Sequence, residues 1–259
     1  MFNRALGFCL AALLILPACQ PKEKAIDVEA EIARNLEEGD SNLRSNQTDE
    51  AETSYKIVLR YDADNADALT GLGRVALERK DPAAAIKSLD KAVAADPSNP
   101  LAHATLGRAL AATKQWAKAA EHLGKAWELN QKIDQYGLEY GAALREAKQL
   151  DKALEVLEEV ADINPRIKHV YRELGKTHFA AKDLDKALRS FMKAQTKWRG
   201  DQDSYAGAAM VYEAQGEVSK SIDQWSSYIQ QDCCSTYSKE VAQPKLAELK
   251  AKENAIPNE

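Results

Sequence analysis

Residues 66–99 read ADALTGLGRVALERKDPAAAIKSLDKAVAADPSN, and this 34-residue stretch decides the fold because its pattern returns along the chain. A glycine recurs every 34 residues, with alanine in the sixth place: Gly39, Gly73, Gly107, Gly141, Gly175 and Ala209. Twelve positions after each comes a small residue: Ala51, Ala85, Ala119, Ala153, Ala187 and Ser221. Four positions later comes a large one: Tyr55, Leu89, Leu123, Leu157, Phe191 and Trp225. A fixed period of this length predicts a solenoid of stacked repeats.

Each copy carries the signals of two helices. In residues 66–99, Leu69 and Gly73 have the spacing that places side chains on one face of a first helix. Asp81-Pro82 opens a second helix, because aspartate caps free amides and proline suits the first helical turn. Leu89 lies on the inner face of that second helix, and Pro97 ends the unit. These positions serve packing, since the small residues allow the two helices to approach closely.

The pattern resembles the tetratricopeptide repeat, whose fingerprint is W-x2-L-G-x2-Y, then A-x3-F, then P. Its marks in the best copy are Leu69, Leu72-Gly73, Ala76, Ala85, Leu89, Ala92 and Pro97. The resemblance implies an all-α fold, a right-handed superhelical solenoid of six such repeats with a C-terminal capping helix. We place the repeats within 32–235, at 32–65, 66–99, 100–133, 134–167, 168–201 and 202–235.

The regularity fails at the two ends of the array. The first copy has Glu38 and Asn42 where apolar residues belong, which suits a terminal repeat with one solvated side. The sixth has Tyr228 in a slot that is otherwise small, so a different kind of element must pack next. Residues 236–259 supply a capping helix and tail, in which Pro244 either starts or kinks the helix. The apolar stripe expected on the capping helix is Val241, Leu246 and Leu249.

The N-terminal residues predict export. Residues 1–18 contain the basic Arg4 and a short apolar run, which is typical of a signal peptide and too short to span a membrane permanently. Leu16-Pro17-Ala18-Cys19 resembles the lipobox of bacterial lipoproteins. That resemblance implies cleavage before Cys19 and acylation of this cysteine with palmitate-type chains. In the alternative, the chain is an ordinary secreted protein with a cysteine near its cleavage site.

The residues after the lipobox indicate where the protein is held. Residues 19–31 form a short lipidated tether and the approach to the first repeat. Gln20 stands where an aspartate tends to retain Gram-negative lipoproteins at the inner membrane. We therefore expect a lipid-anchored protein of the outer membrane that faces the periplasm.

The net charge of the chain argues against some classes of binding partner. The formal net charge is −5 at pH 7, from 35 basic and 40 acidic residues. A nucleic-acid partner calls for clustered Lys and Arg, so this balance argues against one. It also argues against electrostatic adhesion to anionic lipid, which leaves the lipid anchor as the attachment to the membrane. No second apolar stretch has the ~20 residues that a membrane helix needs.

The sequence lacks the patterns of a catalytic or metal site. No HExxH, CxxC or paired-carboxylate pattern accompanies the four histidines. His103 and His178 fall on positions that face the core, and His122 falls on an outward position of a second helix. We therefore expect no enzymatic activity, no cofactor, no metal and no small-molecule substrate, with an envelope enzyme as the disfavoured alternative.

Cys233 and Cys234 are adjacent, where earlier copies have Asp-Pro or an equivalent. Export would place them in an oxidising compartment, where they could form a disulfide with each other. Neighbouring α-carbons across a trans peptide lie ~3.8 Å apart, below the usual ~4.4–6.8 Å of a disulfide, so this bridge would be strained and would stiffen the turn. The alternatives are two partly buried thiols and a bridge to another chain.

The turn inside each repeat raises a question of its own. Such turns often use glycine to reach left-handed backbone angles. Here the slot holds Asn46, Lys80, Lys114, Lys148, Lys182 and Gly216. Four lysines would cost some stability unless the turn takes another form, and the sequence offers no reason for them.

Stacked helical arrays have a concave surface that binds other proteins. The glycine register places these first-helix residues there: Leu36, Leu43, Arg74, Leu77, Leu101, Arg108, Leu138, Arg145, His169, Arg172, Lys176, Phe179 and Met210. Apolar anchors interleaved with basic residues suit an amphipathic peptide or helix with acidic flanks. In the alternative, several of the leucines pack against neighbouring first helices.

A lipoprotein signal, a very short tether and six uninterrupted repeats together resemble the pilotins of type IV pili, the PilF/PilW/Tgl class. The resemblance implies that the protein binds a secretin subunit and promotes its assembly in the outer membrane, on which pilus biogenesis and motility depend. Two other interpretations stay open: an assembly lipoprotein of the Tad-type pilus, and a general envelope scaffold for peptidoglycan enzymes or outer-membrane assembly factors. The resemblance concerns architecture, and a fold alone does not give function.

Overall fold

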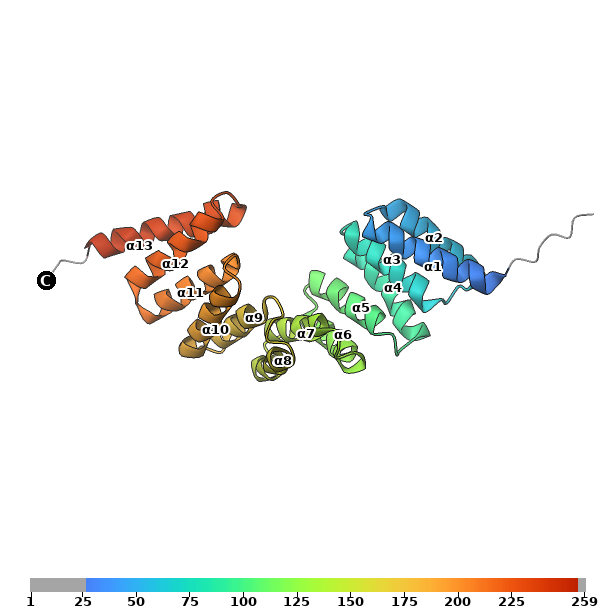
Figure 1. The fold of residues 1–259 in the computed structure, drawn as a ribbon, viewed down its shortest axis with the longest axis horizontal. Helices are drawn as coiled ribbons and strands as arrows, with labels where there is room; N and C mark the ends of the chain where they lie inside the picture. Colours follow the sequence, from blue (N-terminus) through green and yellow to red (C-terminus); the bar gives the residue numbers. More distant parts are fainter. Residues whose placement is uncertain (1–26, 256–259) are drawn as a thin grey trace, which may run out of the picture.

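The computed structural model describes residues 27–255, and this part of the chain consists of helices joined by short turns, without a strand (Figure 1). The prediction of an all-α solenoid is therefore confirmed. The predicted signal peptide, Cys19 and most of the predicted tether lie outside the described residues. Among the described helices, none is both long and apolar enough to cross a bilayer.

The helices form six consecutive pairs followed by a cap. The pairs are α1 (Val28–Arg44) with α2 (Thr48–Tyr61), α3 (Ala66–Glu78) with α4 (Pro82–Ala95), α5 (Pro100–Ala112) with α6 (Trp116–Leu129), α7 (Asp134–Glu146) with α8 (Leu150–Ile163), α9 (Val170–Ala180) with α10 (Leu184–Lys197), and α11 (Gln202–Gln215) with α12 (Val218–Gln231). The cap consists of a π-helix, η1 (Ser238–Ala242), and α13 (Gln243–Ala255).

Side chains just outside the helices fix where several of them begin. Asp81 Oδ1 accepts a hydrogen bond of 3.0 Å from the backbone amide of Ala84, directly before Pro82. Asn99 caps α5 in the same way, through a 3.0 Å bond from the Ala102 amide. Both caps satisfy an amide that has no partner inside the helix, and both precede a proline at the first helical position.

The recurring glycines let the two helices of the first five pairs touch. A Cβ atom built on Gly73 would lie 2.4 Å from Leu89 Cγ, and one on Gly107 would lie 2.5 Å from Leu123 Cγ. The large residue sixteen positions after the glycine therefore occupies the space that a side chain at the glycine would need. Leu89 and Leu123 are both fully or almost fully buried, at 0 % and 2 % exposed.

The turn inside each repeat keeps its left-handed residue even without glycine. The φ angles at this slot are 59° at Asn46, 59° at Lys80, 60° at Lys114, 63° at Lys148, 63° at Lys182 and 77° at Gly216. The geometry lets the chain close the first helix: the amide of Asp81 donates to the carbonyl of Ala76 at 2.9 Å, and that of Lys80 donates to Leu77 at 2.9 Å. This bonding pattern at a helix C-terminus requires the left-handed residue. The lysines thus occupy the strained conformation itself.

The pairs stack into an arc whose two ends, α1–α2 and α12–α13, turn toward the same side (Figure 1). Several first helices contact the first helix of the next repeat. These pairs are α1 with α3, α3 with α5, α7 with α9, and α9 with α11. Because the first helices are drawn together in this way, they line the inner side of the arc.

The hydrophobic core follows the array. One continuous cluster of buried side chains runs from Ala85 to Ala194, through four of the repeats. Separate clusters lie at the two ends, around Tyr55 in the first repeat and around Trp225 in the last.

The cap differs from its prediction in one residue. Leu249 is 3 % exposed and Leu246 packs against the last cluster, as the apolar stripe requires. Val241 is 41 % exposed, so the prediction that it faces the array is wrong. The wider π-helical turn of η1 points Ala242 at the array instead, with no exposed surface. Pro244 is the second residue of α13, directly after the π-helical turn.

Candidate protein-binding groove

Six of the seven predicted groove residues with apolar side chains fall into two groups. Leu101 and Met210 each keep 38 % of their surface exposed and are free to contact a partner. A second set is partly buried against the clusters of its own repeats: Leu36, Leu43, Leu77 and Phe179.

Leu138 was predicted to line the groove, but the structure places it in the core. It is only 6 % exposed and belongs to the central core cluster. It lies in α7, at the middle of the array, where the neighbouring repeats cover it. Leu138 therefore stabilises the stack and presents no anchor surface.

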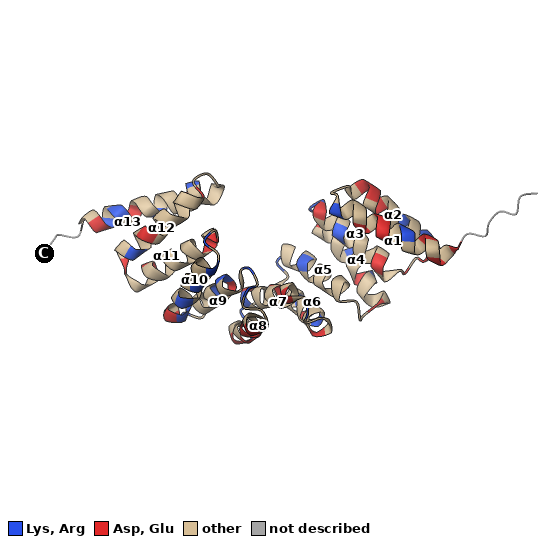
Figure 2. Ribbon diagram, in the orientation of Figure 1, with Lys and Arg blue, Asp and Glu red and all other residues tan. Residues whose placement is uncertain are grey.

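The predicted basic groove residues all have acidic partners within the chain. Most of these ion pairs join one first helix to the next or to its cap: Arg74 with Asp40 at 2.6 Å, Arg108 with Glu139 at 2.8 Å, Arg145 with Glu173, Arg172 with Asp201 at 2.8 Å, and Lys176 with Glu173 at 3.2 Å. Basic and acidic residues are interspersed along the helices (Figure 2). The groove presents compensated pairs where the sequence predicted free positive charge.

Glu173 lies at the centre of this network. Its carboxylate is buried and accepts hydrogen bonds from Arg145 and from Lys176, the latter at 3.2 Å. Burial raises the pKa of this carboxyl, but the charges of Arg145 and Lys176 outweigh that effect and hold the pKa below its usual value. Glu173 is therefore ionised at neutral pH and ties α7 to α9.

His169 stands at the N-terminal end of α9. It precedes the helix with a positive φ of 76°, a conformation that is uncommon for a residue other than glycine. Its Nδ1 lies 3.5 Å from a carboxylate oxygen of Asp201. Burial and the nearby Arg172 guanidinium lower the pKa of the imidazole, so His169 is neutral at neutral pH.

A cavity of about 280 Å³ lies among α5, α6 and α7, beside the predicted groove residues Arg108 and Arg145. Its apolar lining includes Ala111, Trp116 and Ala142. Arg108 and Arg145 also line it, and each is ion-paired, with Glu139 and with Glu146 at 2.9 Å respectively. The arrangement suits an apolar side chain of a partner, held among polar groups that are already satisfied. Ala142 shares its repeat position with the predicted residues Arg108 and Lys176, but its small side chain gave no sign of a contact. Trp116 begins a second helix, so a prediction limited to first helices omits it.

The histidines form a pair that the sequence did not reveal. Nδ1 of His103 lies 3.1 Å from Nδ1 of His122, and Nε2 of His103 lies 3.1 Å from the carbonyl oxygen of Pro97. His103 is buried, as expected, whereas His122 is half-buried and does not simply point outward. Nineteen residues separate the two in sequence, so only the packing of α5 on α6 brings them together. Within residues 27–255, no group of three or more metal-binding side chains is arranged around one point.

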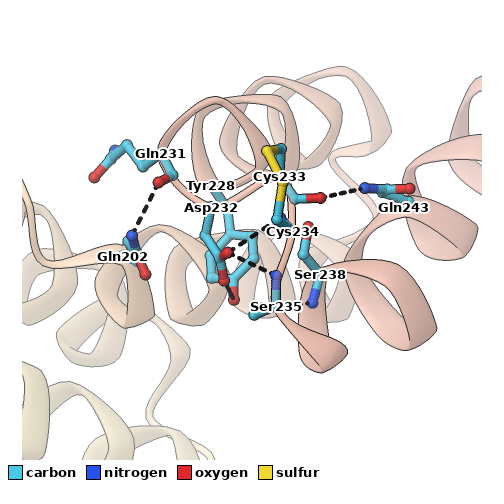
Figure 3. The surroundings of a disulfide bond; sticks show 9 residues. All are labelled: Gln202, Tyr228, Gln231, Asp232, Cys233, Cys234, Ser235, Ser238 and Gln243. Carbon is cyan, nitrogen blue, oxygen red and sulfur yellow. Dashed lines mark hydrogen bonds between the residues drawn. A yellow bond between two sulfur atoms is a disulfide. The ribbon is translucent and has the colours of Figure 1, made fainter.

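Cys233 and Cys234 form a disulfide in the structure, at the turn between α12 and the cap (Figure 3). Both residues are exposed. Two hydrogen bonds involve the backbone of this turn. The Ser235 amide donates to Asp232 Oδ1 at 3.0 Å, and Gln243 Nε2 donates to the Cys233 carbonyl at 3.0 Å. The disulfide thus lies between the last repeat and the first residue of α13.

Comparison with known families decides what kind of array this is. A tetratricopeptide-repeat model matches residues 36–100 and again residues 138–202, and a second model of the same repeat matches residues 76–139. The chain belongs to the tetratricopeptide repeat family. Solenoids of this family bind peptides or proteins along their curved surfaces, and the matches include no catalytic family. A comparison with curated protein sequences finds no significant match.

Solved tetratricopeptide structures share the fold over most of their length. PilF from Pseudomonas aeruginosa superposes with a TM-score of 0.68 at 17 % identity, covering 84 % of this chain and 99 % of PilF. PilW, a type IV pilus biogenesis factor, gives a TM-score of 0.71 at 18 % identity, with 84 % and 99 % covered. MamA gives 0.56 at 29 % identity, with 61 % of this chain and 93 % of MamA covered. At such low identities the likeness to PilF and PilW is one of fold.

Proposed function

We propose that this tetratricopeptide repeat protein is an outer-membrane lipoprotein that binds a secretin subunit and promotes its assembly for type IV pilus biogenesis. The observation that carries the proposal is the extent of the array. Its likeness to the solved chains of PilF and PilW covers 99 % of each, so the solenoid here is as extensive as theirs. The sequence before that domain, residues 1–19, resembles an export signal with a lipobox, which supports the proposed anchor.

The proposed anchor is Cys19, acylated after cleavage of residues 1–18. Each buried methylene adds about 0.8 kcal/mol, so two or more acyl chains hold a protein stably at a membrane. The first helix begins at Val28, only nine residues after Cys19. A tether of that length spans at most ~32 Å even when fully extended, which would keep the groove close to the membrane surface. Gln20 supports sorting to the outer membrane, with the repeats in the periplasm.

The proposed partner surface is the middle of the groove. The cavity among α5, α6 and α7 would take an apolar side chain, and exposed Leu101 lies on α5, which lines it. Because the groove arginines are already paired, recognition would depend on apolar contact more than on acidic flanks. A scaffold of this kind needs neither a cofactor nor a catalytic residue, and we propose that the protein is not an enzyme.

The test is the state of the secretin in cells that lack the protein. Deletion of the gene should abolish heat-resistant secretin multimers on a blot, and the full chain should restore them. Ala142→Trp, which fills the groove cavity, should fail to restore them, whereas Ala83→Trp on the exposed face of α4 should succeed. Both variants must be present at normal levels.

Two experimental outcomes would each overturn one part of this proposal. Unchanged multimers after deletion would overturn the secretin assignment and favour a general envelope scaffold. A Cys19→Ala variant that still fractionates with the outer membrane would overturn the anchor, whatever the secretin does.

A further inference from the structure

The turn that leads into the cap follows a rule shared by other turns of the array. A side-chain oxygen of Asp or Asn accepts a hydrogen bond from the amide two residues later, which forms an Asx-turn. The five cases, each at the same repeat position, are Asp62 at 3.3 Å, Asp96 at 2.9 Å, Asn130 at 3.2 Å, Asn164 at 3.1 Å and Asp232 at 3.3 Å. The connection to the cap is therefore built like a connection between two repeats.

The disulfide takes the position that proline takes in other copies. Pro97 and Pro165 follow Asp96 and Asn164, at intervals of 68 residues from each other and from Cys233. Proline restrains the backbone of a turn by fixing φ. A ring closed between neighbouring cysteines restrains the backbone at this position and at the next one, but a thiol reductant can remove that restraint.

The cap depends on this turn more than a repeat depends on its own. The turn at Pro97 leads into α5, which is held in place by many buried residues. The turn at Cys233 leads into η1 and α13, whose buried apolar side chains are those of Ala242 and Leu249. Polar contacts near the turn help to hold the cap: Gln243 donates to the Cys233 carbonyl at 3.0 Å, and Lys245 pairs with Glu213 at 2.9 Å. Figure 3 shows Gln243 reaching from the cap to the disulfide residue.

We propose that the Cys233–Cys234 disulfide is a reducible lock that keeps residues 236–255 docked on α12. A dithiol reductant opens it by thiol–disulfide exchange. One thiolate of the reductant attacks a sulfur of the bridge, forming a mixed disulfide and releasing the other cysteine as a thiolate, which takes up a proton. The second thiol of the reductant then displaces the remaining cysteine. Two electrons and two protons are transferred, leaving two cysteine thiols and an oxidised reductant.

The position of the bridge suits a reversible role. Both cysteines are exposed, so a reductant can reach them. Their α-carbons lie 3.8 Å apart, closer than in ordinary structural disulfides, and bonds held in such geometry are more readily reduced. A disulfide stabilises a fold mainly by closing a long loop, and this one closes only the two residues that it joins. Its effect is therefore local to the turn and the cap.

The lock also shapes the end of the groove. Tyr237, between the disulfide and the cap, packs edge-on against Tyr228 with ring centres 5.6 Å apart. Both tyrosines line a cavity of about 370 Å³ together with Lys176 and Met210, two of the predicted groove residues. Opening the lock would free Tyr237 and reshape this cavity. The consequence for a partner rests on the proposed function, whereas the lock itself does not.

Hydrogen exchange on the purified full-length protein tests the lock. In dithiothreitol, amide exchange in α12, η1 and α13 should become about tenfold faster or more, while exchange in α5–α8 stays unchanged. A Cys233→Ser/Cys234→Ser variant should exchange like the reduced protein and should not respond to dithiothreitol. Equal exchange of the cap in both redox states would overturn the lock.

Mass spectrometry supplies the second measurement. Trypsin releases residues 221–239 as one peptide that contains both cysteines. Without reductant this peptide should resist alkylation and be lighter by two hydrogen atoms. Two alkylatable thiols there would exclude the bridge, and with it the lock, without touching the secretin proposal.

Discussion

At the scale of single residues, the array depends on places where no side chain fits. Gly107 lies against Leu123, and a Cβ atom there would come within 2.5 Å of the leucine Cγ. We expect Gly107→Ala to lower the free energy of unfolding by about 1–3 kcal/mol, because the two helices must move apart. Chemical denaturation measures the change. Gly200→Ala is the control, since nothing lies within 4 Å of a Cβ there, and an equal loss in both variants would contradict the packing argument.

The lysines in the left-handed turns lead to a prediction of the opposite sign. Lys114 adopts a φ of 60°, which costs a residue with a Cβ atom roughly 1–2 kcal/mol. Gly216 shows that the same slot accepts glycine in this chain. Lys114→Gly should therefore raise the free energy of unfolding by about 1 kcal/mol, after the entropy cost of glycine is subtracted. Lys118→Gly, inside α6, should lower it by about 1 kcal/mol. A destabilised Lys114→Gly variant would show that the lysine makes a contact worth more than the strain.

At the scale of elements, the contact between α5 and α6 includes a titratable pair. Nδ1 of His122 faces Nδ1 of His103 at 3.1 Å, so one nitrogen must carry a proton and the other must not. Burial and the neighbouring His103 lower the pKa of His122, against the opposing effects of Glu121 on the same helix and Asp90 on α4.

The direction of this shift sets a pH dependence. Because the pKa of His122 is lower in the folded protein than the ordinary ~6.5, the unfolded chain binds more protons and stability falls as pH drops below that value. The free energy of unfolding should decrease between about pH 7.5 and about pH 5.5. His122→Gln should reduce this decrease but leave a remainder, since burial also lowers the pKa values of His169 and His178. An unchanged pH profile in the variant would contradict the assignment.

The elements also show why sequence reasoning succeeded where it did. The 34-residue period carries information about every position that packs in the same way in each copy, such as Gly73 and Leu89. It correctly predicted the helix pairs for that reason. The ion pairs lack this regularity: Arg108 reaches Glu139, 31 residues on, whereas Arg145 reaches Glu173, 28 residues on.

Contacts that depend on the packing of particular side chains could not be read from the period. The buried position of Leu138 and the meeting of His103 with His122 arise from neighbouring helices that the repeat pattern does not specify. The exposure of Val241 depends on one π-helical turn in the cap, which a helical stripe of regular spacing cannot anticipate. The predicted groove residues lie on or directly before first helices, but their ion pairs and the nearby cavity could be described only from the structure.

At the scale of the whole molecule, the distribution of the core predicts how the array comes apart. A continuous cluster joins the middle repeats, and separate clusters hold the two ends. In a solenoid, stability is approximately the sum of the repeats and of the contacts between neighbours. The ends should therefore open at lower free energy than the middle, and hydrogen exchange should be slowest in α5–α8.

Two matched leucine substitutions test this division. Leu123 and Leu249 are buried to nearly the same degree, at 2 % and 3 % exposed, but Leu123 belongs to the central cluster and Leu249 to the cap. Leu123→Ala should lower the free energy of the main unfolding transition by about 2–5 kcal/mol, because its cavity opens in the cluster that the middle repeats share. Leu249→Ala should speed exchange in α12 and α13 while leaving the main transition in place. If Leu249→Ala shifted the main transition as far as Leu123→Ala does, the array would unfold as a single unit and the cap would be part of its core.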